Sequence, residues 1–472
     1  MIDRVQDFIR RALLSLGNRG MKYVRITITT VLILTVVGLA IFFFMPGLQL
    51  NTTSPEMTSD SLLEAADLVV AASDSPHKEL ADYVCDGISD EIEIQAAIDT
   101  LPSDGGTVLL LEGTYTIDGV PTVHPEYRSI IILKDNVSLV GSGPTTILKL
   151  ADYYETRVAG IIGNSKYPVI YNNVRIANLQ VDGNKSGVWE TQTGIYLQTA
   201  HDSIVENNVI SSCTNHGIQI YSGSRRVTVR NNTVQRSLIG IYVDTVSDIV
   251  VTGNTVQDNQ YYNIWLDAAH YSTVRGNVLV GGQIGIGLVR ASNNNTIIGN
   301  TIERPSGDGI EIKSDMYSYE FGDGVRNNTI SENSISFSGR DGISIVNTPS
   351  DVLAANDCNI IINNTISGSK HHGISLVSDH NLIKNNLILE SSQESNNEYD
   401  GIFLYDGASY NEIAGNVLRN GAGVNKPRYG INISEASCVE NVVRDNDLRN
   451  SGHTGNLDDA GTNTEVQQKE GN

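Results

Sequence analysis

Short hydrophobic runs recur at a regular interval along most of the chain. Each run has the form Gly-Ile-x followed by Ile, Leu or Val, and Asn263-Ile264-Trp265-Leu266 takes the same place once. Successive runs are 22–24 residues apart up to Gly309 and 28–33 residues apart beyond it. The glycines that open these runs are Gly194, Gly217, Gly240, Gly285, Gly309, Gly342, Gly373, Gly401 and Gly430.

A second unit keeps step with the first. It is Asn, then any residue, then an apolar residue, and no helical periodicity intervenes between the two units. Asn suits a turn because it tolerates left-handed backbone and bonds local backbone and neighbouring side chains. The asparagines of this unit are Asn208, Asn232, Asn254, Asn277, Asn300, Asn333, Asn364, Asn386, Asn416 and Asn446.

A period of this length with short β-branched runs predicts a parallel β-helix. Leucine-rich repeats share the period but need a Leu-rich scaffold, and a propeller blade needs roughly 40 residues. Coils should stack about 4.8 Å apart. Alternation along each strand then places one interior column of isoleucines, at Ile195, Ile218, Ile241, Ile264, Ile286 and Ile310. The longer intervals after Gly309 indicate loops inserted into coils, and such loops tend to line a functional face.

The beginning of this region predicts a cap. Residues 90–98 form an amphipathic pattern with Ser89 or Asp90 as the N-cap, and a helix here would cover the open end of a solenoid. The stretches 81–87, 105–110, 113–117 and 136–143 accompany it. Together with the repeats, this run resembles the pectate-lyase-like superfamily of right-handed parallel β-helices, in particular its pectate-lyase-3 and polygalacturonase-like branches. The resemblance covers about residues 79–460 and implies the fold; that scaffold serves many activities.

Residues 26–45 break the pattern. They are twenty residues without a charge, enough to span a bilayer as a helix. Residues 1–25 carry six basic and two acidic residues, so we expect a cytoplasmic N-terminus and an extracellular remainder. A cleaved signal peptide is the alternative and would make the protein secreted. The expected organisation is 1–25 cytoplasmic, 26–45 transmembrane anchor, 46–78 linker, 79–460 β-helix and 461–472 tail.

Composition narrows the possible partners. The 472 residues carry a net charge of −22, which disfavours nucleic acid. Cys85, Cys213, Cys358 and Cys438 have no metal-site spacing, so a zinc site is not expected, and buried free thiols are at least as plausible as disulfides. Eight glycosylation sequons follow residue 45, although the recurrent Asn-Asn-Thr among them also has the structural explanation given above.

The outward positions of the Gly-Ile-x runs predict a sugar-binding face. Aromatic rings beside carboxylates stack on sugar rings and bond their hydroxyls. The alternative is that Tyr and Trp simply favour exposed strand positions. The expected substrate-binding residues are Tyr196, Tyr221, Tyr242, Trp265, Glu311 and Lys313.

Just before the glycines, a second set suggests chemistry. Asp308, Asp341, His372 and Asp400 fall on four successive coils and should form a column with about 5 Å between neighbours. Paired carboxylates with a nearby His suit glycoside hydrolysis, and they equally suit a Ca²⁺ site. The alternative is that Asp-Gly is a common turn dipeptide.

The order of these units is similar to the polygalacturonase family, in which Asp-Gly-Ile, an acidic pair and His-Gly-Ile-Ser occupy consecutive coils. Here Asp308 lacks a preceding Asn-Thr, Asp341 follows Arg340, and the family's Arg-Ile-Lys is replaced by Asp400-Gly401-Ile402. A metal-dependent lyase is a further alternative, with Asp244, Asp267 and Glu311 beside Lys313 or Arg290; no motif singles these out. His216 is expected to be structural.

Two functions remain open from the sequence. The first is a membrane-anchored surface β-helix that binds, and in one version cleaves, an acidic polysaccharide, with no cofactor or with Ca²⁺. The second is a structural or adhesive surface module without catalysis.

Overall fold

The computed structural model describes residues 59–119, 129–164, 169–187, 191–314, 324–346 and 356–467. The chain divides into two units, Met1–Thr58 and Ser59–Asn472. The first unit lies outside the described residues, and with it the expected anchor at 26–45. Within the ranges described, no helix combines the length and the apolar character that a membrane span requires.

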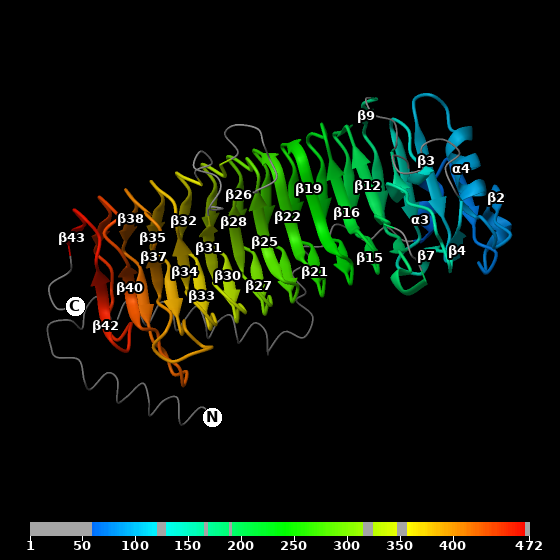
Figure 1. Cartoon of the computed structure of the whole chain (residues 1–472). Coiled ribbons are helices and arrows are strands. Elements are labelled where there is room, and N and C mark those ends of the chain that lie inside the picture. The colour runs from blue at the N-terminus through cyan, green and yellow to red at the C-terminus, as the bar shows by residue number, and fades with distance from the viewer. Residues whose placement is uncertain are drawn as a thin grey trace, which may run out of the picture. The chain divides into compact units, whose positions relative to one another are not determined.

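The unit that begins at Ser59 is a parallel β-helix whose coils each contribute one strand to three long sheets (Figure 1). Neighbouring strands in every sheet come from successive coils. The first sheet contains, in spatial order, β2 (Tyr83–Val84), β1 (Leu68–Ala71), β3 (Gly106–Leu110), β6 (Val137–Gly141), β10 (Arg175–Ala177), β14 (Ile204–Glu206), β17 (Thr228–Arg230), β20 (Val250–Thr252), β23 (Thr273–Arg275), β26 (Thr296–Ile298), β29 (Thr329–Ser331), β32 (Ile360–Ile362), β35 (Leu382–Lys384), β38 (Glu412–Ala414), β41 (Val442–Arg444) and β43 (Glu465–Gln467).

The second sheet runs along another side of the coil. It contains β4 (Gly113–Ile117), β7 (Thr146–Leu150), β11 (Gln180–Asp182), β15 (Val209–Ser211), β18 (Thr233–Gln235), β21 (Thr255–Gln257), β24 (Val278–Val280), β27 (Thr301–Glu303), β30 (Ser334–Ser336), β33 (Thr365–Ser367), β36 (Leu387–Leu389) and β39 (Val417–Arg419).

The third sheet is built from the Gly-Ile-x runs. It contains β5 (Ser129–Ile132), β8 (Gly160–Gly163), β12 (Ile195–Gln198), β16 (His216–Tyr221), β19 (Ile239–Ser247), β22 (Tyr262–His270), β25 (Ile284–Val289), β28 (Ile310–Lys313), β31 (Ile343–Val346), β34 (Ile374–Leu376), β37 (Ile402–Leu404), β40 (Tyr429–Ile433) and β42 (Gly455–Asp459). A small pair, β9 (Tyr171–Asn172) and β13 (Ala200–His201), lies beside it.

The predicted interior column of isoleucines is confirmed. Ile195 pairs with Ile218, Ile218 with Ile241, and the register continues without a slip to Ile310. These side chains are fully buried, and the column runs on through later coils despite their longer intervals. A one-residue slip would turn the whole row outward, so the burial of this row fixes the register.

The repeated asparagines form a continuous buried ladder. Asn232, for example, donates from Nδ2 to Oδ1 of Asn254 at 3.0 Å and to the carbonyl of Val205 at 2.9 Å. The predicted bond to the neighbouring side chain is therefore confirmed, but left-handed backbone belongs to the preceding residue, such as Asn231 with φ 55°. The reason is that the ladder side chain must point inward, while the residue before it makes the corner. A parallel ladder, unforeseen from the sequence, joins Asn295, Asn328, Asn359, Asn381, Asn411 and Asn441.

The cap is the helix α4 (Glu91–Thr100), which buries Ile94, Ala97 and Ile98 against the first coils. Asp90 is its N-cap residue, but the carboxylate accepts the backbone N–H groups of Gly87 and Thr116 instead of capping the helix. This ties α4 to the second sheet. The remaining short helices are α3 (Ser59–Ala65), η1 (Lys78–Leu80) and η3 (Lys185–Gly187).

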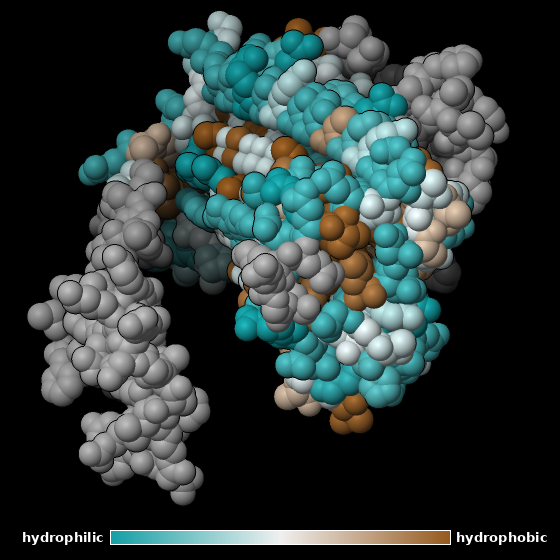
Figure 2. Space-filling model, turned by 90° about the vertical axis from the view of Figure 1, so that its left-hand side faces the viewer, coloured by the Kyte–Doolittle hydropathy of each residue, from teal (hydrophilic) through white to brown (hydrophobic). Residues whose placement is uncertain are grey.

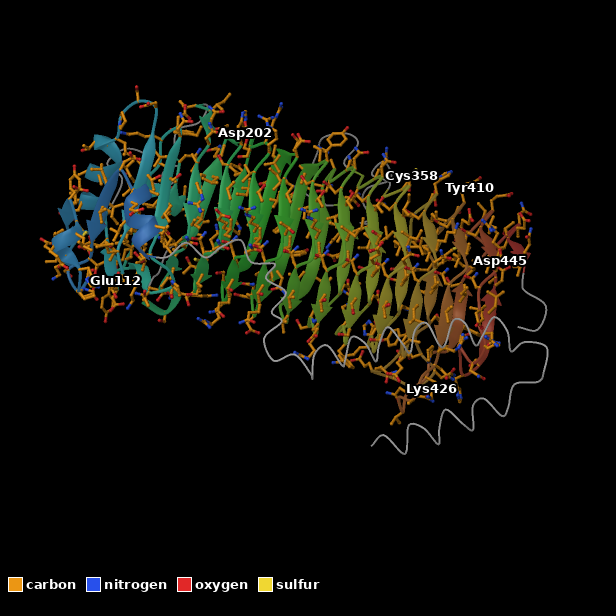
Figure 3. The ribbon with its side chains drawn as sticks, turned by 180° about the vertical axis from the view of Figure 1, so that it is seen from behind. Glu112, Asp202, Cys358, Tyr410, Lys426 and Asp445 are labelled. Carbon is orange, nitrogen blue, oxygen red and sulfur yellow. The ribbon has the colours of Figure 1, made fainter. Side chains whose placement is uncertain are left out.

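The fold extends beyond the limits suggested by the sequence. Strand β1 lies before residue 79, within the expected linker, and β43 lies within the expected tail. Seen from the side of the last coils, the surface is mainly hydrophilic with scattered hydrophobic patches (Figure 2). Asp202, Cys358 and Tyr410, which all have left-handed backbone, lie along one edge of the coil (Figure 3).

Candidate functional site

The outward row of the third sheet brings together the residues expected to bind sugar. Register pairs join Tyr196 to Gln219, Tyr242 to Trp265 and Gly287 to Glu311, so these residues follow one another coil by coil. The full row is Tyr196, Gln219, Tyr242, Trp265, Gly287, Glu311, Ser344, Ser375, Phe403 and Asn432. The next outward row places Tyr221 beside Asp244, and Asp244 beside Asp267.

The aromatic residues at the start of this row pack against one another and are not open to solvent as expected. Tyr196 and Tyr242 are only 7% and 9% exposed, while Tyr221 and Trp265 are half-buried. Rings one coil apart are close enough to tile: Tyr242 lies 4.8 Å from Trp265 and Tyr196 lies 6.0 Å from Tyr221, between ring centroids. The first aromatic cluster, as we name it, comprises Tyr196, His216, Tyr221, Tyr242, Tyr262 and Trp265.

Gly287 allows this cluster to reach Glu311. The ring of Tyr262 stacks on Trp265 at 4.8 Å and lies across Gly287, where an added Cβ would be 2.5 Å from the ring. The hydroxyl of Tyr262 then donates to Oε2 of Glu311 at 2.8 Å. Burial raises the pKa of Glu311, with the positive charge of Lys313 and this hydrogen bond opposing the effect.

A polar network lies beneath the same cluster. The Tyr242 hydroxyl oxygen is 3.0 Å from Oδ2 of Asp244 and 2.8 Å from Oδ2 of Asp267. Arg290 bonds Asp267 through Nε and reaches Oδ1 of Asp244 at 3.4 Å through Nη2. Burial raises the pKa of Asp267, while the bond from Arg290 lowers it. We name Tyr242, Asp244, Asp267 and Arg290 the Tyr–Asp network.

The expected column on the preceding positions is formed. Backbone bonds from Gly309 to Asp341 at 3.0 Å, from Gly342 to His372 at 3.0 Å and from Gly373 to Asp400 at 3.2 Å place the four side chains on adjacent coils. All three carboxyl groups are buried. The sequence alone thus located this column correctly, although its chemistry depends on the bonds described next.

Both oxygens of Asp308 and of Asp341 accept hydrogen bonds from the following coil. Asp308 accepts the N–H of Asp341 at 3.0 Å and the hydroxyl of Ser344 at 2.8 Å. Asp341 accepts the N–H of His372 at 2.9 Å and the hydroxyl of Ser375 at 2.6 Å. Burial, and then the nearby Asp308, raise the pKa of Asp341, so the pair favours a state in which Asp341 retains a proton.

His372 and Asp400 are held more firmly. Nδ1 of His372 accepts the N–H of Asp400 at 3.0 Å, and burial lowers the pKa of His372 to about 3, so the ring is neutral with its proton on Nε2. The carboxylate of Asp400 receives Arg428 at 2.8 Å, the N–H of Tyr429 at 3.0 Å and the amide of Asn432 at 3.0 Å. Asp400 is therefore fully satisfied within the scaffold.

Further along the row lies a second aromatic cluster that the sequence did not single out. His372 stacks on Phe403 at 4.4 Å, and Phe403 on Tyr405 at 4.8 Å. His371 stacks on Tyr399 at 4.2 Å and bonds Glu394 at 2.7 Å. Tyr399 comes from an insertion between coils, and the neighbouring Phe403 in the outward row was the signal that could have indicated this cluster.

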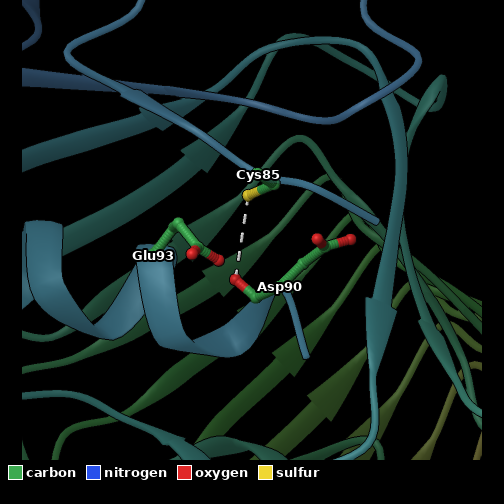
Figure 4. Close-up of side chains that lie close together, drawn as sticks. All are labelled: Cys85, Asp90 and Glu93. Atoms are coloured by element: carbon green, nitrogen blue, oxygen red, sulfur yellow. Dashed lines mark hydrogen bonds between the residues drawn. The ribbon is translucent and has the colours of Figure 1, made fainter. Parts of the chain in front are cut away.

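A separate group of candidate metal ligands lies near the cap (Figure 4). Ligand atoms of Cys85, Asp90 and Glu93 lie within 4.8 Å of one another, and this is the one such group in the parts of the chain that the structure describes. The Cys85 thiol points to the carbonyl of Asp90 at 3.8 Å. Burial and the nearby acidic residues raise the pKa of the thiol, so it stays protonated. The described cysteines are all free.

The chain matches one family model twice. Residues 132–306 and 306–468 each match the model described as "Periplasmic copper-binding protein (NosD)". A comparison with curated protein sequences finds no match.

Solved structures share the fold at low sequence identity. The A-module of the Azotobacter vinelandii mannuronan C-5 epimerase AlgE6 has a TM-score of 0.60 and 18% identity, covering 82% of this chain and 97% of that one. The tailspike protein of E. coli bacteriophage HK620, solved with a hexasaccharide, has a TM-score of 0.61 and 15% identity, covering 86% and 81%. The Dettilon tailspike protein has a TM-score of 0.57 and 15% identity, covering 89% and 71%.

Proposed function

The chain belongs to the NosD family of right-handed parallel β-helix proteins, and from that premise we propose that it binds a polysaccharide outside the cytoplasm. The polysaccharide lies along the outward row of the third sheet. The observation that carries this proposal is the arrangement of that row, in which two aromatic clusters flank a polar stretch.

The dimensions suit an extended oligosaccharide. Trp265 and Phe403 are separated by five coil steps, or roughly 24 Å at about 4.8 Å per step. Between them the row offers Gly287, Ser344 and Ser375, which leave room above the sheet, and Glu311 as a hydrogen-bonding group. Aromatic faces at both ends and polar groups between them match the alternating apolar and hydroxyl surfaces of a sugar chain.

The solved relatives support this use of the scaffold by analogy of fold. One was solved with a hexasaccharide, and another is named as a mannuronan epimerase. Their likeness to this chain is in the fold, so the proposal depends on the side chains just described.

We place the β-helix on the outer surface of a membrane, held there by residues 26–45. Support comes from the uncharged stretch and the basic residues before it. The outward carboxylates exceed the cations, so an acidic glycan would need Ca²⁺ or a locally neutral site.

The family name raises copper, and the described residues do not fit it. Copper in proteins prefers imidazole, thiolate and thioether ligands. The Cys85–Asp90–Glu93 group has no histidine, and its thiol is held in the protonated form. We therefore route no chemistry through copper.

Hydrolysis of the bound glycan is a second candidate function, favoured by the raised pKa of Asp341 beside Asp308 on the neighbouring coil. A general acid must hold a proton at working pH, and a second carboxyl group must activate water or form the intermediate. Asp308, Asp341 and His372 would supply these groups, while Asp400 would support the scaffold.

The test uses the full chain in a mild detergent. Binding of uronate and neutral polysaccharides is measured with and without Ca²⁺, and with Cu²⁺ alone as a separate sample. Reducing ends and unsaturated products are followed in the same mixtures. Trp265→Ala and Phe403→Ala, at opposite ends of the row, should each weaken binding about tenfold, whereas Tyr410→Ala on a distant edge should not.

The outcomes separate the candidates. Binding without products supports the binding function, and reducing ends that disappear in Asp341→Asn support hydrolysis. Unsaturated products that require Ca²⁺ indicate a lyase. Folded protein that binds no polysaccharide would refute the proposal and leave a structural surface module.

A further inference from the structure

The Tyr–Asp network contains more hydrogen-bonding oxygens than its formal protons can serve. One tyrosine oxygen lies within hydrogen-bonding distance of a carboxyl oxygen of Asp244 and of another from Asp267, at 3.0 and 2.8 Å. All three residues are buried, so water is not at hand to relieve the contacts. A phenol carries one proton and can donate one hydrogen bond.

Counting protons shows what the geometry requires. If the Tyr242 hydroxyl donates to one carboxylate, the contact with the other is between two acceptors. Two hydrogen bonds among three oxygens need two protons, one from the phenol and one from a carboxylic acid. The second proton belongs to the pair of aspartates as a unit, because such coupled groups share their titration.

The balance of charge leads to the same count. Arg290 is the cation that contacts both carboxyl groups, so with both ionised the network would carry one buried negative charge without a partner. The other titratable groups that face it are Tyr196, Tyr221 and His216. Burial raises the pKa of both tyrosines and lowers that of His216 to about 4, so all three are neutral.

We infer that Asp244, Tyr242 and Asp267 hold one shared proton at neutral pH, which makes the network with Arg290 a neutral site for the carboxylate of a uronate unit. This rests on the proposed polysaccharide binding. About a third of the Arg290 side chain is exposed, and its Nε and Nη2 face the aspartates. The outer edge of the guanidinium is then directed to a ligand beside the first aromatic cluster.

The shared proton decides which glycans are accepted. While it is present, Arg290 can receive an anionic sugar without a neighbouring excess of negative charge. As pH rises and the proton is lost, the network becomes negative by one unit. A uronate is then repelled from close range, whereas a neutral sugar is not affected.

The proton itself is tested without any glycan. Infrared difference spectra of the full chain, wild type minus Asp244→Asn and wild type minus Tyr242→Phe, should show the carbonyl band of a protonated carboxylic acid at neutral pH in the wild type. Asp248→Asn, a turn residue outside the network, is the matched control and should leave that band unchanged. Absence of the band in both difference spectra would overturn the inference.

Its role in binding is tested with hexamers of galacturonate, mannuronate and guluronate, and with the same hexamers reduced to neutral sugars. A bound uronate hexamer should bind roughly tenfold more weakly to wild type once pH rises above the loss of the proton, the effect expected of one added charge nearby. Asp244→Asn, which keeps the network neutral, should bind it equally at both pH values. The reduced hexamer should show no pH dependence.

The two proposals fail in different ways. If no hexamer binds, polysaccharide binding fails and the infrared band alone decides the shared proton. If uronate and reduced hexamers bind alike at every pH, the uronate site is refuted while the binding function stands.

Discussion

Asp341 shows how a single buried carboxyl group can serve the scaffold and still be chemically active. Its oxygens join the coil to His372 and Ser375, yet its pKa is raised by burial and by Asp308. A carboxyl whose folded pKa exceeds its unfolded value contributes stability below the unfolded value, and this contribution is lost as pH rises through the folded value.

Asp341→Asn should therefore make stability less dependent on pH. Asn can still accept the N–H of His372, and its amide can donate to Ser375. We expect the variant to gain on the order of 1–2 kcal/mol relative to wild type between about pH 4 and 7, measured by denaturant unfolding across that range. Asp248→Asn, on an exposed turn, serves as the control. Parallel curves for wild type and Asp341→Asn would show that the carboxyl titrates normally.

Gly287 makes a sharper prediction at the same scale. Gly287→Ala would place a Cβ 2.5 Å from the ring of Tyr262, so the ring must leave its position over the sheet. We expect a changed near-ultraviolet circular dichroism signal from the displaced ring and roughly tenfold weaker glycan binding. Tyr262→Phe keeps the ring and loses the bond to Glu311, so it should bind more tightly than Gly287→Ala. Equal affinity of the two would mean that the ring's position is irrelevant.

At the scale of elements, the asparagine ladder carries the corner between the first and second sheets. Asn232 accepts two bonds from Asn208 and donates to Val205 and Asn254. Its neighbour Asn231 makes the turn itself, exposed and with positive φ. The two adjacent asparagines therefore have separable roles.

Asn232→Ala should destabilise the protein by roughly 3 kcal/mol because it strands buried donors and acceptors on both neighbouring coils. Asn231→Gly should change stability by less than about 1 kcal/mol, since Gly adopts positive φ freely. Denaturant midpoints of the two variants provide the comparison. A similar loss in both would contradict the assignment of the buried bonds to Asn232 alone.

The elements also show what a sequence can and cannot reveal. The Gly-Ile-x and Asn units determine the strands, the register and the column of Asp308 because each is repeated and each alternates with the pleat. The placement of Tyr262 over Gly287 joins side chains two coils apart, and no repeat encodes it. The same holds for Arg290, which follows a strand and reaches back to Asp244 and Asp267.

At the scale of the whole molecule, each coil of the Ser59–Asn472 unit contacts only its neighbours in the strand order. Stability in such a solenoid is a sum of local terms, so damage should stay local. The cap α4 closes one end with Ile94 and Ile98, whereas β43 at the other end is exposed.

Ile94→Ala with Ile98→Ala should loosen the capped end and leave the far coils intact. Each substitution removes a buried side chain worth about 2–5 kcal/mol. Hydrogen exchange should rise in β1, β3 and β4 and stay unchanged in β36 and β39. A uniform rise along the cylinder would show that the coils unfold as one unit. Leu457→Ala, in the last coil, should affect only the opposite end.

The ladder of ten asparagines has one further consequence. Each side-chain amide donates to the next coil and never to the previous one, from Asn208 through to Asn446. The amide dipoles therefore point the same way and add along the axis, much as peptide dipoles add in an α-helix. The cylinder consequently has an electrical polarity, with its donor end at the last coils, and the two directions along its surface are not equivalent to a charged chain lying on it.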